Sequence, residues 1–94
     1  MSAQESNPTD KPPKQIHIIK MSQDFFPAYK SRKRNGQIRL NDRSYQEGDL
    51  LIIQEWSDLL KVKTGAEFIA QITNISSPPG MLPDHILIHA RPLT

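Results

Sequence analysis

Residues 49–56 read DLLIIQEW and form the clearest strand pattern in the chain. Alternate residues of a strand point to opposite faces, so Leu51 and Ile53 share one face and Leu50 and Ile52 share the other. Both faces are apolar in the first half of this stretch, which is typical of a strand covered on both sides. The stretch therefore predicts a strand in the middle of a β-rich core.

Four further strands are predicted from the alternation of apolar and polar residues. They cover residues 15–20, 37–40, 67–75 and 85–89. Together with residues 49–56 they make five strands against one helix, which excludes a parallel α/β sheet. The expected fold class is therefore α+β and β-rich, either an open sheet or a small β-barrel.

Alternation also indicates which side chains share a face and which face is apolar. Phe68, Ala70 and Ile72 form the apolar face of the fourth strand along the chain. In the second strand the apolar residues are Ile38 and Leu40, so we expect these two to face the core. The polar residues beside them are expected to face away from it.

The helix is predicted over residues 24–32, directly after the first strand. With Asp24 as its N-cap, Pro27 falls in the first turn, where the missing N–H of proline has no intrahelical partner to lose. The spacing of apolar residues assigns its buried face. That face is expected to consist of Phe25, Ala28 and Tyr29.

Size and composition favour one domain in a chain of 94 residues. Residues 1–14 hold three prolines and almost no apolar side chains, so we expect a disordered tail before a domain over residues 15–94. The chain has no cysteine, which excludes a thiolate zinc site and fits a reducing compartment. With no apolar run of roughly 20 residues and no secretory signal, we expect a cytoplasmic monomer that does not bind a membrane.

Basic residues gather in one short segment. Six of the twelve Lys and Arg residues are Lys30, Arg32, Lys33, Arg34, Arg39 and Arg43. Asp42 is the one acid within this segment. Two interpretations stay open: the cations could complement a helix C-terminus in solvent, or they could form an anion-binding face for phosphate.

Residues 37–58, QIRLNDRSYQEGDLLIIQEWSD, resemble an uncharacterised family of bacteria and phages that is related to the ASCH domain. The matching residues are Ile38, Arg39, Asn41, Asp42, Arg43, Gln46, Gly48, Asp49, Leu50, Leu51 and Ile52. The likeness extends back to residue 17 and forward to TGAEFIAQITNI at residues 64–75. It implies a PUA-like fold, a small and partly closed β-barrel with the early helix packed across one opening. The cleft beside that helix is where relatives are thought to hold RNA or a nucleoside.

The ASCH signature G-x-K-x-x-E-x-R maps onto residues 32–39 with three departures. Arg32 stands at the glycine, Arg34 at the lysine and Gln37 at the glutamate, while Arg39 keeps the arginine. Glutamine retains hydrogen-bonding length but loses the charge and the base function. Relatives that resemble N4-acetylcytidine amidohydrolases use a lysine and a threonine at the positions of Arg34 and Gln37. Arginine cannot be deprotonated in a protein, so we expect no catalytic residue here.

The resulting hypothesis is a non-catalytic module, without a cofactor, that binds RNA or a nucleotide. Its expected site residues are Lys30, Arg32, Lys33, Arg34, Gln37, Arg39, Asn41 and Arg43. Arginine and lysine would meet backbone phosphates, and Gln37 and Arg39, which share a strand face, would read a base or ribose. Arg39 is expected to keep its guanidinium partly free instead of pairing with an acid such as Asp49 or Glu55.

Two alternatives remain, amide hydrolysis on a modified nucleoside and a phage or bacterial accessory role in which the chain binds a protein partner. A metal site is not expected. His85 and His89 share a strand face but would lie about 13 Å apart, too far to chelate one ion.

Overall fold

The computed structural model describes residues 15–94, so the tail expected over residues 1–14 lies outside the described residues. The elements in chain order are β1 (Ile16–Ser22), α1 (Phe26–Lys30), β2 (Gly36–Leu40), β3 (Leu50–Ser57), β4 (Val62–Ser76) and β5 (His85–Pro92). The expected β-rich fold, with five strands and one helix after the first strand, is confirmed. No helix in this described part is long and apolar enough to cross a membrane.

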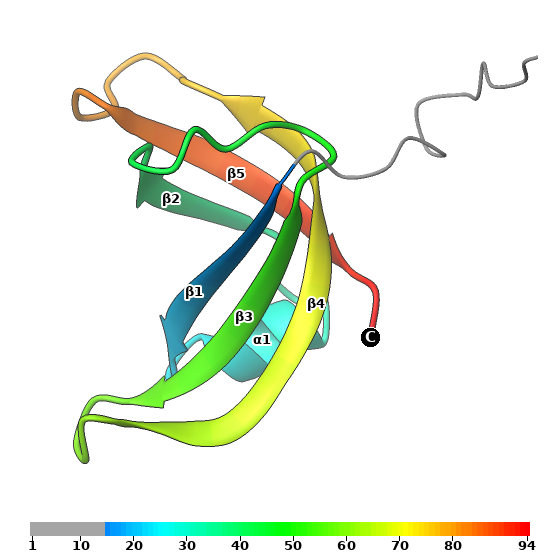
Figure 1. The fold of residues 1–94 in the computed structure, drawn as a ribbon. Coiled ribbons are helices and arrows are strands. Elements are labelled where there is room, and N and C mark those ends of the chain that lie inside the picture. Colours follow the sequence, from blue (N-terminus) through cyan, green and yellow to red (C-terminus); the bar gives the residue numbers. More distant parts are fainter. Residues whose placement is uncertain (1–14) are drawn as a thin grey trace, which may run out of the picture.

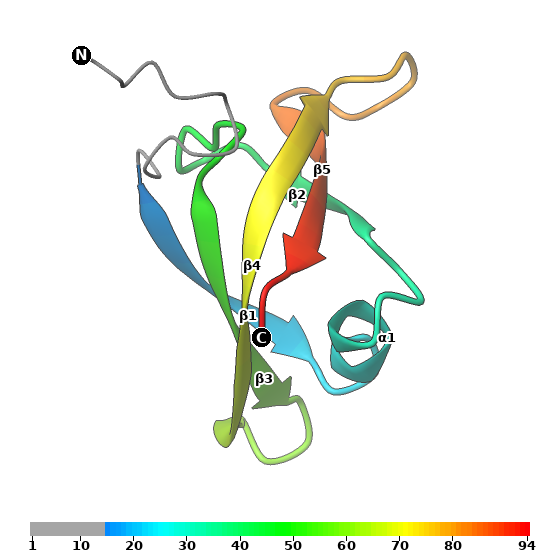
Figure 2. The ribbon, with the colours of Figure 1, turned by 90° about the vertical axis from the view of Figure 1, so that its right-hand side faces the viewer.

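The five strands form one sheet in the order β1-β3-β4-β5-β2. β1 runs parallel to β3, and the other neighbouring pairs are antiparallel. β4 is the longest strand and pairs with both neighbours along different parts of its length, with register shifts at two points that allow the sheet to bend. The sheet curls into a half-barrel, so that the edge strands β1 and β2 lie on either side of an opening (Figure 1). Figure 2 shows α1 at one end of this opening, directly after β1.

The concave side of the half-barrel holds the hydrophobic core. Leu51 and Ile53 of β3 are almost completely buried. Leu50 and Ile52 on the convex side are only half-buried. β3 is therefore fully covered on one face, whereas the sequence predicted cover on both. The rest of the core includes Ile19, Met21, Phe26, Tyr45, Phe68, Ala70, Ile72, Ile86, Ile88 and Ala90. The inner face predicted for the strand around residues 67–75 is therefore confirmed.

The expectation that Ile38 and Leu40 face the core is wrong. Their side chains are 62% and 48% exposed, because they point to the convex side of β2. Arg39 pairs in register with the buried residue Ile86, and residues directly opposite each other on neighbouring strands share a face. The polar residues of β2 therefore face the concave side, where the core gives way to the opening. There their hydrogen-bonding groups can find partners that a closed core would not supply.

The helix is shorter than expected and turns a different aromatic residue inward. It begins at Phe26 and ends at Lys30, and its N-cap is Phe25 instead of Asp24. Pro27 does lie in the first turn, as the sequence argument required. Phe26 is buried and its ring meets the ring of Phe68 edge-on, with 5.2 Å between centroids, whereas Phe25 is 48% exposed.

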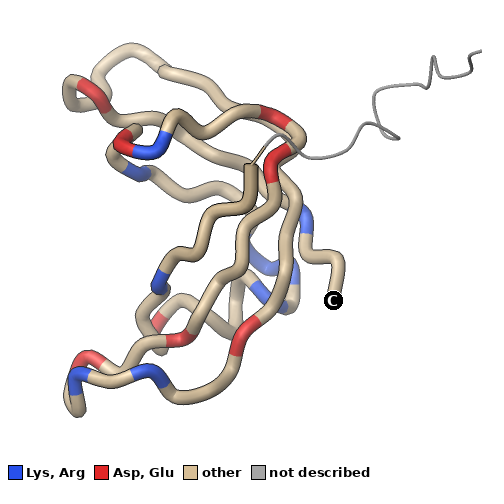
Figure 3. The backbone as a smooth tube through the Cα atoms, in the orientation of Figure 1, with Lys and Arg blue, Asp and Glu red and all other residues tan. Residues whose placement is uncertain are grey.

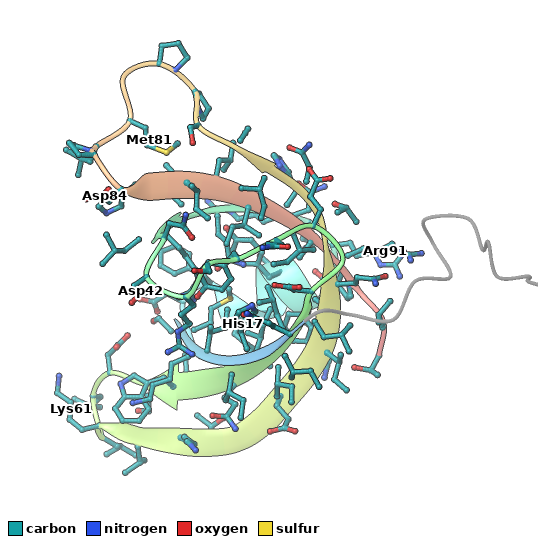
Figure 4. The ribbon with its side chains drawn as sticks, turned by 45° about the horizontal axis from the view of Figure 1, so that its top comes forward. His17, Asp42, Lys61, Met81, Asp84 and Arg91 are labelled. Carbon is teal, nitrogen blue, oxygen red and sulfur yellow. The ribbon has the colours of Figure 1, made fainter. Side chains whose placement is uncertain are left out.

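A buried polar pair ties β1 to the segment before β3. His17 Nε2 lies 2.9 Å from Asp49 Oδ2, and both side chains are buried. The same carboxylate oxygen accepts a hydrogen bond from the backbone N–H of Gln46 at 3.1 Å. Gly48 precedes it with a φ of 94°, a conformation that glycine adopts without strain. Figure 4 shows His17 inside the curl of the half-barrel. The Gly-Asp step therefore has a structural role.

Candidate functional site

A cleft of about 800 Å³ lies in the opening of the half-barrel. Its walls come from β1, from α1 and the residues on either side of it, from β2 and the loop that follows β2, and from Leu87 of β5. Charged residues on these walls are Lys20, Arg34, Arg39, Arg43 and Asp42. Four cations and one carboxylate give the described lining a formal charge of +3. Figure 3 shows basic residues on both sides of the opening, and Figure 4 shows Asp42 at its mouth.

Three aromatic side chains also line the cleft. Phe25 is half exposed, and the guanidinium carbon of Arg34 lies 5.7 Å from the centroid of its ring. The Tyr29 hydroxyl donates a hydrogen bond to the carbonyl of Gly36, which ties the helix to the first residue of β2. Tyr45 is buried with its ring centroid 4.6 Å from that of His17. The cleft thus combines positive charge with flat apolar surface.

Arg39 is half-buried and donates two hydrogen bonds. Its Nε donates to Gln37 Oε1 at 2.6 Å and its Nη2 donates to the carbonyl of Lys20 at 3.0 Å. Asp49 and Glu55, the acids considered as partners from the sequence, contact other residues instead. The guanidinium is therefore anchored by neutral oxygens and keeps its positive charge uncompensated by either of them.

Burial affects ionisation of two groups in this site. It lowers the pKa of Arg39 from its ordinary value, although arginine remains protonated in proteins. It raises the pKa of Tyr45, so the phenol stays neutral well beyond physiological pH. The site presents a fixed cation beside a neutral hydroxyl.

Two arginines, Arg39 of β2 and Arg43 of the loop that follows it, reach across the opening to β1. β1 ends the strand order, so one side of its backbone has no neighbouring strand in the described part of the chain. Arg39 donates to the carbonyl of Lys20, and Arg43 Nη1 donates to the carbonyl of Ile18 at 2.8 Å. These two side chains, here called the arginine bridge, donate to backbone carbonyls that a neighbouring strand would otherwise bind.

The structure brings four of the eight expected site residues together in the cleft, namely Arg34, Gln37, Arg39 and Arg43. Arg32 instead adopts a left-handed conformation with a φ of 69° and donates to the carbonyl of Pro92 at 3.0 Å. Asn41 lines a separate hollow formed with residues 77–86. Lys30 and Lys33 are exposed and do not belong to the cleft lining.

Sequence reasoning missed the cleft residues Lys20, Phe25, Tyr29, Asp42 and Tyr45 as members of the site. Phe25 and Tyr29 had been assigned to a buried helix face, and Lys20 is the one basic residue of β1. Asp42 could have been included, because it is one of the residues that match the family within residues 37–58. No pattern in the sequence singled out Tyr45.

Metal binding finds no support in the geometry of residues 15–94. Among them, no three His, Asp or Glu side chains come close enough together to hold an ion. His85 Nδ1 lies 2.9 Å from the carbonyl oxygen of Pro83, within its own loop.

Fold and cleft together define a small half-barrel protein with an open, basic and aromatic cleft at its edge. The chain belongs to the family described as a domain of unknown function (DUF3850), whose model matches residues 16–88. It is also similar to a curated protein of Escherichia phage P2, the "Uncharacterized 12.9 kDa protein in GpA 3'region", with 34% identity over 74 residues. That match covers 79% of this chain and 66% of the relative, so the chain spans just under two thirds of the relative's length. The expected kinship with an uncharacterised family that has phage members is confirmed.

Proposed function

We propose that the cleft binds RNA or a nucleotide and carries out no catalysis. The observation that carries this proposal is the convergence of four cations and three aromatic rings in one open cleft. Cations bind phosphate oxygens, and an aromatic ring stacks on a base whatever its identity. Phe25 is the exposed ring, and Arg34 beside it could contact the phosphate of a nucleotide stacked there.

Gln37 is suited to reading a base edge. Because Arg39 donates to its Oε1, the amide of Gln37 is oriented with its NH₂ group toward other partners. That group can donate two hydrogen bonds to acceptors on a base or ribose. Arg39 in this proposal both orients Gln37 and contributes positive charge to the cleft.

We also infer kinship with the ASCH branch of PUA-like barrels. It is supported by the curled sheet, by the helix after the first strand and by the cleft beside that helix. Non-catalytic binding is supported by Arg34, which stands where hydrolase relatives have a lysine and lines the cleft itself.

Fluorescence anisotropy with a labelled short single-stranded RNA and a labelled nucleotide at low salt tests the proposal. Arg34→Ala should weaken binding about fivefold to tenfold, the loss expected for about 1–1.4 kcal/mol of charge-assisted hydrogen bonding. Lys33→Ala is the matched control, because it removes the same charge one residue away but outside the cleft. Absence of binding, or equal losses in the two variants, would refute the proposal.

A further inference from the structure

A hollow distinct from the one lined by Asn41 lies on the other side of the arginine bridge. Its volume is about 450 Å³, and it is lined by Ile18, Ile19, Lys20, Arg39, Arg43, Gln54 and Lys63. Ile18, Lys20 and Gln54 occupy the convex face of the sheet, because β1 buries the alternate residues His17, Ile19 and Met21. Of the described residues that line this outer hollow, four are cations and none is an acid.

The outer hollow and the cleft share three residues, Lys20, Arg39 and Arg43. They therefore meet at the arginine bridge. A guanidinium carries five N–H donors, and the bonds to β1 carbonyls use one from each arginine. Further N–H groups of the bridge can donate to a ligand that crosses it.

The two hollows differ in what they can recognise. The cleft has aromatic rings within its own lining, whereas the lining of the outer hollow is cationic, and the Trp56 ring beside it is covered by the Lys20 ammonium, 4.2 Å from the ring centroid. A single nucleotide would occupy the cleft alone. A chain of nucleotides would use both, with one base in the cleft and the phosphates of its neighbours over the bridge and on Lys63.

We propose that the ligand is a single-stranded polynucleotide whose backbone crosses the arginine bridge into the outer hollow. This inference rests on the proposed function of the cleft and specifies its ligand class. A single strand is required because bases stacked in a duplex cannot turn into such a cleft, whereas those of a single strand can. Lys20 and Lys63, from β1 and β4, become phosphate-contacting residues.

The test compares the affinities of the full chain for a mononucleotide, a short single-stranded RNA and the same RNA as a duplex. The single strand should bind at least tenfold more tightly than the mononucleotide. Lys63→Ala should weaken binding of the single strand about threefold to tenfold, leave mononucleotide binding unchanged, and reduce the slope of log K against log salt by roughly 0.7. Lys61→Ala is the control, because Lys61 carries the same charge at the tip of the β3–β4 hairpin (Figure 4). It lines neither the cleft nor the outer hollow.

Each other outcome contradicts a distinct part of this account. Equal affinities for mononucleotide and single strand, or equal losses in Lys63→Ala and Lys61→Ala, would overturn the inference and leave the cleft as a mononucleotide site. Binding of the duplex as tight as that of the single strand would overturn the single-strand requirement. No binding of any of the three would overturn the proposed function itself. Thermal unfolding of each variant confirms that a lost affinity is not lost folding.

Discussion

Arg39 joins the structure of the opening to its chemistry. Its guanidinium orients Gln37 and also occupies a backbone acceptor at the free edge of β1. From the sequence, the guanidinium was expected to stay partly free and not to pair with an acid such as Asp49 or Glu55. In the structure it also donates to the carbonyl of Lys20, so its removal affects stability, because a removed donor leaves its acceptor without the partner it had.

Arg39→Ala should therefore reduce both stability and binding. We expect the free energy of unfolding to fall by about 1 kcal/mol, a modest loss because the hydrogen bond to Lys20 is exposed to water. RNA or nucleotide affinity should fall as well, because Gln37 loses the contact that orients it. Urea unfolding and anisotropy titration measure the two effects. Arg91→Ala removes the same charge outside the cleft and should change neither by much, and an Arg39→Ala protein with unchanged affinity would mark Arg39 as purely structural.

Tyr45 makes the stability of the fold depend on pH in the alkaline range. Burial raises the pKa of its phenol in the folded protein, so the folded state retains the proton more strongly than the unfolded state. The stability from this group is fully present below the unfolded pKa of about 10 and is lost as pH rises through the folded pKa. Unfolding free energies measured from neutral to alkaline pH should fall more steeply for the wild type than for Tyr45→Phe. Identical curves would show that Tyr45 ionises as freely in the fold as outside it.

The positions of the strands could be predicted from the sequence more completely than which face of each strand points to the core. Alternation located all five and identified the inner face of β4, because Phe68, Ala70 and Ile72 leave one apolar choice. The same alternation failed for Ile38 and Leu40. A period of two shows which residues share a face, but the curl of the sheet decides which face is inside.

The prediction of the buried face of the helix was wrong for a related reason. A helix of five residues is too short for its spacing to select one face, and adjacent Phe25 and Phe26 both offered an anchor. The structure buries Phe26 against Phe68 and leaves Phe25 at the cleft. Packing against β4, which is remote in the sequence, settled the choice.

These two phenylalanines provide a matched pair of substitutions. Phe26→Ala should lower the free energy of unfolding by about 3–5 kcal/mol, as expected when a buried aromatic side chain is removed. Phe25→Ala should cost less than about 1 kcal/mol, because the side chain is half exposed, but should weaken nucleotide or RNA binding. Urea unfolding and anisotropy distinguish the two. If Phe25→Ala left affinity unchanged, its ring would not be a stacking surface.

At the scale of the whole molecule, the site depends on the curl of the sheet, which local sequence patterns do not predict. β1 and β2 are separated by one short helix in the chain but stand at opposite edges of the sheet. Only the curl through β3, β4 and β5 brings them to the same opening (Figure 1). Half of the expected site residues line the cleft. They could be named from the sequence because the resemblance implied a cleft beside the helix. Lys20 and Lys63 could not be assigned because their role depends on how the strands are arranged in space.

The central claim is that the opening between β1 and β2 is a nucleotide-binding site, and its most direct test is an NMR titration of the full chain with short single-stranded RNA at low salt. We expect backbone amide shifts to change at Lys20, Phe25, Arg34, Gln37 and Arg43, which line the cleft. Amide shifts of residues 77–86, which form the separate hollow with Asn41, should not change. Shifts that avoid the cleft residues, or no shifts at all, would contradict the account.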